Sequence, residues 1–113
     1  MLNPVPSPQL IQAIRARVPG WRAFRMVEFV QSWAIAEHDV GRPITIEDYA
    51  AWWREGSRST AYRRLAEFRE AFAPLDSPSD ALVWPKSRAD RVGARSALKP
   101  SARLVALVEQ SPG

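Results

Sequence analysis

The stretch Glu55–Leu65, EGSRSTAYRRL, predicts the start of a helix with an unusual charge. Ser57 is a good N-cap, because its hydroxyl can accept a hydrogen bond from a backbone N–H of the first turn. Arg58, Arg63 and Arg64 then fall in the first two turns, with no acid between them. A helix dipole favours anions at this end. The arginines therefore indicate an anionic ligand outside the chain.

A helix from Ser57 to Phe72 would be amphipathic. Four apolar residues fall within a narrow arc of a 3.6-residue period, and we expect this arc to face the core: Ala61, Leu65, Phe68 and Phe72. The opposite side carries Ser59, Arg63, Ala66 and Glu70. Arg58 and Arg64 fall nearer the core edge. The acids Glu67 and Glu70 occur only in the second half of the helix.

The residues before this helix predict a shorter helix and a tight turn. Thr45 and Asp48 have the spacing of a capping box, with Asp48 in place of the usual Glu or Gln. The expected inner stripe consists of Ile46, Tyr49, Ala50 and Trp53. The helix is expected to end near Arg54, and Gly56 permits the turn. A short helix, a tight turn and a second helix with a basic first half form the helix-turn-helix pattern.

The run Ser57–Leu65, SRSTAYRRL, resembles Ser-Arg-Ser-Thr-Val-Tyr-Arg-x-Leu in the helix-turn-helix domains of resolvase- and invertase-type recombinases and of many small bacterial regulators. The resemblance covers residues 45–72 and implies binding to double-stranded DNA. It also implies that Ser57, Ser59 and Arg63 contact bases or phosphates.

The same resemblance implies that Ala61 and Leu65 pack against the preceding helix. The turn departs from the family pattern, which has Gly, then Val or Ile, then Ser. Here Gly56 directly precedes the serine, so the apolar residue of the turn is missing. We expect Trp52 or Trp53 to fill that space.

The expected DNA-binding surface consists of Ser57, Arg58, Ser59, Thr60, Tyr62, Arg63 and Arg64. Arg58 and Arg64, at the margins of the core stripe, are expected to hold phosphates, and Arg63 is expected to contact a base edge, that of guanine. The alternative is a solvent-exposed helix stabilised by ion pairs. In that case Glu67 would pair with Arg63 at i,i+4 and with Arg64 at i,i+3.

The rest of the chain predicts three segments: an extended lead-in over residues 1–7, a helical helix-turn-helix domain over 8–73 and a basic C-terminal extension over 74–113. Ser7 and Pro8 are expected to start a helix over 8–18. A central helix is expected over 21–37, because its apolar residues, Trp21 and Phe24 among them, cover much of its circumference. A loop is expected over 38–43 and another over 75–80.

The C-terminal extension has two features of interest. The run 81–84, ALVW, is strand-like and leaves open a short β wing near 81–92. The basic residues that follow are candidate phosphate contacts: Lys86, Arg88, Arg91 and Arg95. A last helix after Pro100 would present an apolar edge, and we expect a homodimer to use it. That edge consists of Leu104, Leu107 and Val108.

Composition excludes several classes of protein. The chain has 113 residues, a net charge of +4 and no cysteine, which predicts one domain without disulfides. His38 is the only histidine, so no metal site is expected. No nucleophile–base pair or glycine-rich phosphate loop is evident, so we expect no catalytic residues, no cofactor and no enzyme. Without a signal peptide or an apolar run of membrane-spanning length, the expected location is cytoplasmic.

These patterns predict a mainly α fold: a compact helical bundle that contains a helix-turn-helix. The expected function is sequence-specific DNA binding, as a small transcriptional regulator. One alternative is a helical protein–protein adaptor that uses the Trp52–Trp53 pair as its contact. Another is an accessory protein for plasmid or phage replication, partition or excision.

Overall fold

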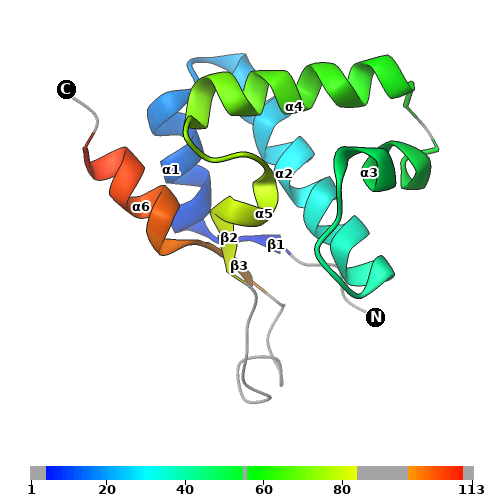
Figure 1. Cartoon of the computed structure of the whole chain (residues 1–113). Helices are drawn as coiled ribbons and strands as arrows, with labels where there is room; N and C mark the ends of the chain where they lie inside the picture. Colours follow the sequence, from blue (N-terminus) through cyan, green and yellow to red (C-terminus); the bar gives the residue numbers. More distant parts are fainter. Residues whose placement is uncertain (1–4, 55, 84–96, 111–113) are drawn as a thin grey trace.

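Helices make up most of the structure. The computed structural model describes residues 5–54, 56–83 and 97–110 (Figure 1). The helices in these ranges are α1 (Pro8–Arg17), α2 (Trp21–Val40), α3 (Ile46–Trp52), α4 (Arg58–Phe72), α5 (Pro78–Ala81) and α6 (Ala102–Glu109). The strands are β1 (Val5–Pro6), β2 (Leu82–Val83) and β3 (Ala97–Pro100). The prediction of a mainly α fold is confirmed.

Side-chain caps fix the starts of several helices where the sequence predicts them. The Ser7 hydroxyl accepts a hydrogen bond from the backbone N–H of Leu10 at the start of α1, at 3.2 Å. At the start of α3, Thr45 and Asp48 form a reciprocal capping box, with distances of 3.1 and 3.2 Å. The hydroxyl of Ser57 accepts from the N–H of Thr60 at 3.1 Å. Each cap satisfies a backbone donor that the helix itself leaves unpaired.

The core lies around the middle and end of α2. This helix contacts α1, α3, α4 and α5 (Figure 1). Trp33 is fully buried and stacks on Tyr49 of α3, with ring centroids 5.3 Å apart. The start of α2 differs from the prediction, because Trp21 and Phe24 are each 70% exposed. Ala23 and Met26 of the same segment are buried, so Trp21 and Phe24 lie on the face of α2 that the other elements leave open to solvent.

The expected loop over 38–43 begins later than predicted. Residues 38–40 continue α2, which ends at Gly41 in the left-handed conformation, at φ 84°. Glycine adopts this conformation without the steric cost of a Cβ, so it is a common helix terminator. The short helix α5 lies partly in the segment expected to be a loop over 75–80, and Pro78 occupies its first turn.

A small sheet joins the two ends of the chain. Its strand order is β1-β3-β2, with β1 parallel and β2 antiparallel to β3. Leu98 of β3 and Leu104 of α6 belong to the same buried cluster as Leu10 of α1. The C-terminal extension therefore shares one core with the helical segment, and the lead-in joins it through the pairing of β1 with β3.

The apolar edge expected to form a dimer lies at the border of this core. Leu104 is buried, and Leu107 and Val108 pack against the core cluster. Leu107 and Val108 stay partly exposed, and the homodimer stays a prediction. Among the described helices, none is both long enough and apolar enough to cross a membrane.

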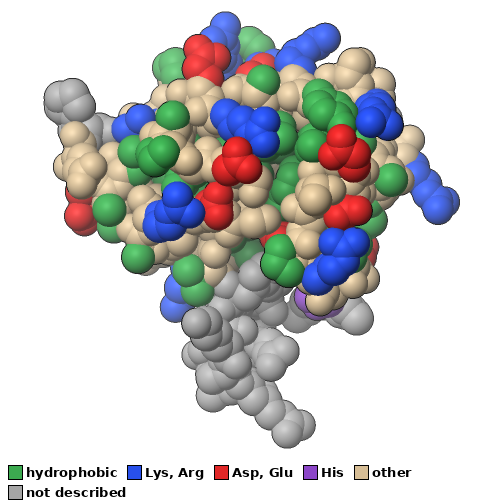
Figure 2. Space-filling view, in the orientation of Figure 1, with side chains coloured by type: hydrophobic (Ala, Val, Ile, Leu, Met, Phe, Trp, Pro, Cys, Tyr) green, Lys and Arg blue, Asp and Glu red, His purple; other side chains and the backbone are tan. Residues whose placement is uncertain are grey.

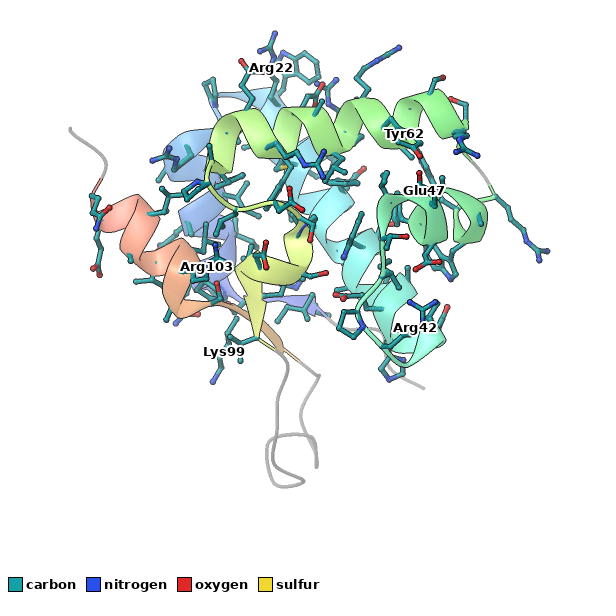
Figure 3. The ribbon with its side chains drawn as sticks, in the orientation of Figure 1. Arg22, Arg42, Glu47, Tyr62, Lys99 and Arg103 are labelled. Carbon is teal, nitrogen blue, oxygen red and sulfur yellow. The ribbon has the colours of Figure 1, made fainter. Side chains whose placement is uncertain are left out.

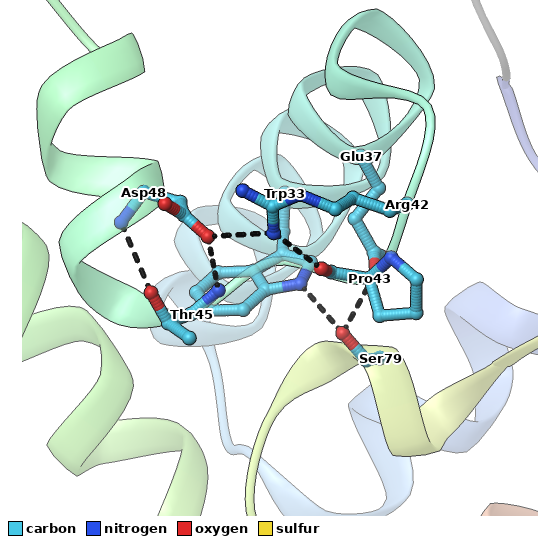
Figure 4. A network of polar contacts seen from close by, with 7 residues as sticks. All are labelled: Trp33, Glu37, Arg42, Pro43, Thr45, Asp48 and Ser79. Atoms are coloured by element: carbon cyan, nitrogen blue, oxygen red, sulfur yellow. Dashed lines mark hydrogen bonds and ion pairs between the residues drawn. The ribbon is translucent and has the colours of Figure 1, made fainter.

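A polar network ties α5 to the end of α2 (Figure 4). The indole N–H of Trp33 donates to the Ser79 hydroxyl, which in turn donates to the carboxylate of Glu37, each at 2.9 Å. Burial raises the pKa of Glu37, and hydrogen bonds from Ser79 and from the backbone of Ile44 oppose this rise in part. The fold thus holds a carboxylate where water is partly excluded.

The raised pKa of Glu37 predicts a pH-dependent effect of Glu37→Gln. A carboxyl whose pKa is raised by folding stabilises the protein at low pH, and this contribution is lost as pH rises through that pKa. We expect the stability difference to shift in favour of Glu37→Gln between about pH 4 and about pH 7. Urea unfolding of both proteins across this range measures the difference. A difference that stays constant would contradict the effect of burial.

Candidate nucleic-acid interface

Helix α4 lies along one side of the molecule, and its buried and exposed faces are the ones that the sequence predicts. Its core stripe is buried: Ala61, Leu65, Phe68 and Phe72 are each at most 2% exposed. The opposite residues are all exposed: Ser59, Arg63, Ala66 and Glu70. Helix α3 packs beside the first half of α4, and α2 contacts both (Figure 1). Packing against α2 and α3 therefore holds α4 and its exposed side in place.

Trp53 occupies the turn between α3 and α4. A Cβ added to Gly56 would overlap the Trp53 ring, so the indole covers this glycine. The Trp53 ring also stacks on Tyr49, with centroids 5.8 Å apart. Trp53, one of the two tryptophans expected at this turn, therefore packs against it. The neighbouring Trp52 donates its indole N–H to Asp39 at 2.9 Å.

Gly56→Ala is expected to destabilise the fold by about 1–3 kcal/mol, the usual cost of overpacking. The added methyl group needs space that the Trp53 ring occupies. Denaturant unfolding measures the cost, and a double-mutant cycle with Trp53→Leu assigns it to this contact. The same glycine change should cost less in the Trp53→Leu background. Equal costs in the two backgrounds would contradict the contact.

The hydroxyls of the first turn of α4 form a local cluster. Ser57 Oγ lies 2.7 Å from Thr60 Oγ1 and 3.2 Å from Ser59 Oγ, besides accepting from the Thr60 backbone. Ser57 therefore acts as the predicted N-cap. Ser59 is exposed, whereas Thr60 is half-buried. All three residues were predicted to contact DNA, and of these Ser59 lies on the same side of α4 as Arg63.

Tyr62 belongs to the contact between α3 and α4. Its hydroxyl donates to Glu47 of α3 at 2.5 Å, and Figure 3 shows the two side chains meeting. This hydrogen bond lowers the pKa of Glu47. Arg58 donates to the same hydroxyl at 3.3 Å, and its guanidinium lies 5.5 Å from the centroid of the Tyr62 ring. Tyr62, predicted to contact DNA, thus positions the exposed Arg58.

Arg64 also serves a contact within the chain. Its side chain is 20% exposed and lies 3.6 Å from the carboxylate of Glu67. Arg25 of α2 binds the same carboxylate at 2.9 Å. One ion pair of the alternative interpretation, Arg64 with Glu67, is therefore present. Arg64 is consequently less accessible to a phosphate than the sequence predicts.

Arg63 is the predicted contact that the structure presents most openly. Its side chain is exposed, and the described residues offer it no hydrogen-bond or ion-pair partner. The i,i+4 pair with Glu67 does not form, because Arg25 and Arg64 engage that carboxylate instead. The guanidinium of Arg63 can therefore bind an external ligand without breaking an internal contact.

The predicted wing near 81–92 falls mainly on residues outside those described, as do all four of its candidate phosphate contacts: Lys86, Arg88, Arg91 and Arg95. The described strands β2 and β3 form an antiparallel pair, with Val83 opposite Lys99. This pair lies across the fold from α4 (Figure 1).

The surface outside this helix shows no second concentration of charge on the face in view. Figure 2 shows basic and acidic side chains interspersed there. Within the described ranges, no group of three or more His, Cys, Asp or Glu side chains could hold a metal ion. The candidate site is the exposed side of α4 and its margins, where the exposed Arg58 and Arg63 lie.

Comparisons of the chain with protein families, with curated proteins and with solved structures find no match. A function for this surface can therefore be inferred only from its geometry and charge. Sequence reasoning missed the roles of Glu47 and Arg25, which hold Tyr62 and Glu67. Both contacts join residues of different helices, and no local spacing indicates them.

Proposed function

We propose that the protein binds double-stranded DNA in a sequence-specific manner and acts as a small transcriptional regulator. Helices α3 and α4 would form its helix-turn-helix, with the first half of α4 in the major groove. The observation that carries the proposal is the exposed, unpartnered guanidinium of Arg63, opposite a fully buried stripe. The proposal includes a cytoplasmic location.

The charges on α4 support this orientation. Arg58 and Arg63 lie in its first half, and both side chains are exposed. The nearby acids are engaged within the chain: Glu47 accepts from Tyr62, and Glu67 pairs with Arg25 and Arg64. A phosphate that approaches the first half of α4 therefore meets cations that are available and acids that are already paired.

Arg58 and Arg63 have different proposed roles. Arg63 points away from the core stripe, so it would reach a base edge, and guanine offers two acceptors that match its forked donors. Arg58 is held beside the ring of Tyr62 at the margin of α4. A fixed cation at this margin suits the phosphate backbone, which flanks a helix in the major groove.

The adaptor alternative would use the Trp52–Trp53 pair, and both residues already make contacts within the chain. Trp53 packs on Gly56 and Tyr49, and Trp52 is half-buried and donates to Asp39. An accessory role in replication, partition or excision would use the same DNA-binding surface, so it remains the nearer alternative. The nature and location of the bound DNA site separate that role from transcriptional regulation.

Selection of bound sequences from a random duplex pool tests the proposal. We expect enrichment of a defined site and an electrophoretic shift at submicromolar protein in low salt. A palindromic site would also indicate that the protein binds as a dimer. No shift of any duplex at micromolar protein in low salt would overturn the proposed function and favour the adaptor.

A further inference from the structure

The start of α2 exposes an aromatic side chain that is nevertheless held in place. Trp21 is 70% exposed, yet the guanidinium of Arg25 lies 4.8 Å from the centroid of its ring. Arg25 is itself fixed by its ion pair with Glu67 of α4, at 2.9 Å. The exposed indole is thus linked through Arg25 to the helix proposed to enter DNA.

Two hydrogen-bond donors at this position have no partner among the described residues. They are the indole N–H of Trp21 and the guanidinium of the exposed Arg22. The two residues are adjacent in the first turn of α2. Donors without acceptors, one of them charged, match a ligand rich in anionic oxygen.

The location of Arg22 beside α4 indicates which anionic ligand these donors could bind. Figure 3 places Arg22 above the C-terminal half of α4, whereas Tyr62 and Glu47 lie beside its N-terminal half. Arg22 lines an open groove of about 670 Å³, together with Glu67 and Glu70 of α4. A helix in the major groove has a phosphate backbone on each side of it. Arg58 lies in the first turn of α4 and Arg22 lies near its C-terminal half, so Arg22 can meet a flanking backbone that Arg58 does not reach.

We propose that Trp21 and Arg22 bind the phosphate backbone of the same duplex that α4 enters. Arg22 supplies the charge, and the Trp21 indole N–H supplies a second, uncharged donor. The proposal rests on the proposed function, since it takes the position of the duplex from α4. It assigns a DNA contact to a helix outside the predicted helix-turn-helix.

Glu70 provides a test of opposite charge for the proposal. Its exposed carboxylate lines the same groove as Arg22, and the described residues offer it no ion-pair partner. A phosphate bound in this groove would be repelled by that carboxylate. Arg22→Ala should therefore weaken binding, whereas Glu70→Gln should tighten it.

Binding curves at several salt concentrations test the inference, with the selected site and a scrambled duplex as ligands. Loss of one phosphate contact lowers the salt slope by about 0.9, which amounts to about eightfold weaker binding at roughly 0.1 M salt. We expect this loss for Arg22→Ala, equally on both duplexes. Trp21→Phe keeps an aromatic ring but lacks the N–H donor, so it should weaken both without changing the slope.

Lys99→Ala is the matched control. It removes the same formal charge from an exposed side chain that lies across the fold from α4 (Figure 3). Thermal melts of all variants should match wild type, because the changed side chains lie at the surface. If Arg22→Ala binds like Lys99→Ala while the wild-type protein binds its selected site, only this inference fails. If the wild-type protein binds no duplex, the proposed function fails as well.

Discussion

Leu65→Ala is expected to lower the free energy of unfolding by about 2–5 kcal/mol, the range for truncating a buried leucine. Leu65 is 2% exposed and lies in the stripe that fixes α4 to the core. The loss combines the transfer of the side chain to water with the cavity that remains. Since domains of this size are stable by only about 5–15 kcal/mol, this one change removes a large share of the stability.

Arg63→Ala is the control for the face of α4, because Arg63 lies two residues away on the exposed side. Its melting temperature should match that of the wild-type protein, since exposed substitutions usually change stability by less than about 0.5 kcal/mol. Denaturant and thermal unfolding rank the two variants. If Arg63→Ala proved the more damaging of the two, the assignment of the buried and exposed faces would be wrong.

The features that sequence predicted well depend on residues close together in the chain. Ser57 caps α4 through an N–H three residues away, and Thr45 pairs with Asp48 over the same spacing. The buried stripe of α4 likewise follows from helical periodicity. The exposed position of Arg63 could therefore be predicted before any tertiary contact was known.

The features that sequence did not predict depend on distant parts of the chain. Arg25 binds Glu67 across 42 residues, and Tyr62 reaches Glu47 in another helix. These contacts decide which arginines remain available to a ligand. Because the sequence does not reveal them, Arg64 was predicted to contact a phosphate. Trp21 was counted among the apolar residues of a central helix for a similar reason, because periodicity does not tell which faces of that helix its neighbours cover.

Arg63→Ala is expected to remove most of the preference for the selected site over a scrambled duplex. A bidentate arginine–guanine pair discriminates against the wrong base by about 1–3 kcal/mol, which corresponds to roughly fivefold to 150-fold in affinity. Removing the side chain takes away both hydrogen bonds to the base edge. Binding to scrambled DNA should weaken much less, because that binding depends on phosphate contacts.

Arg58→Ala provides the comparison for this effect. Its guanidinium lies beside Tyr62 at the margin of α4, so its loss should weaken both duplexes similarly and lower the salt slope by about one ion. Titrations of the two variants with both duplexes distinguish the two roles. If Arg63→Ala weakened both duplexes equally, Arg63 would be a phosphate contact, and the specificity would lie in residues such as Ser59.

The central claim is that the first half of α4 enters the major groove, and methylation interference tests it most directly. Methylation of guanine N7 blocks an acceptor in the major groove that an arginine would use. We predict that methylation of at least one guanine in the selected site prevents binding of the wild-type protein. Arg63→Ala should become insensitive to methylation of that guanine. Binding that tolerates N7 methylation throughout the site, in both proteins, would contradict the placement of α4 in the major groove.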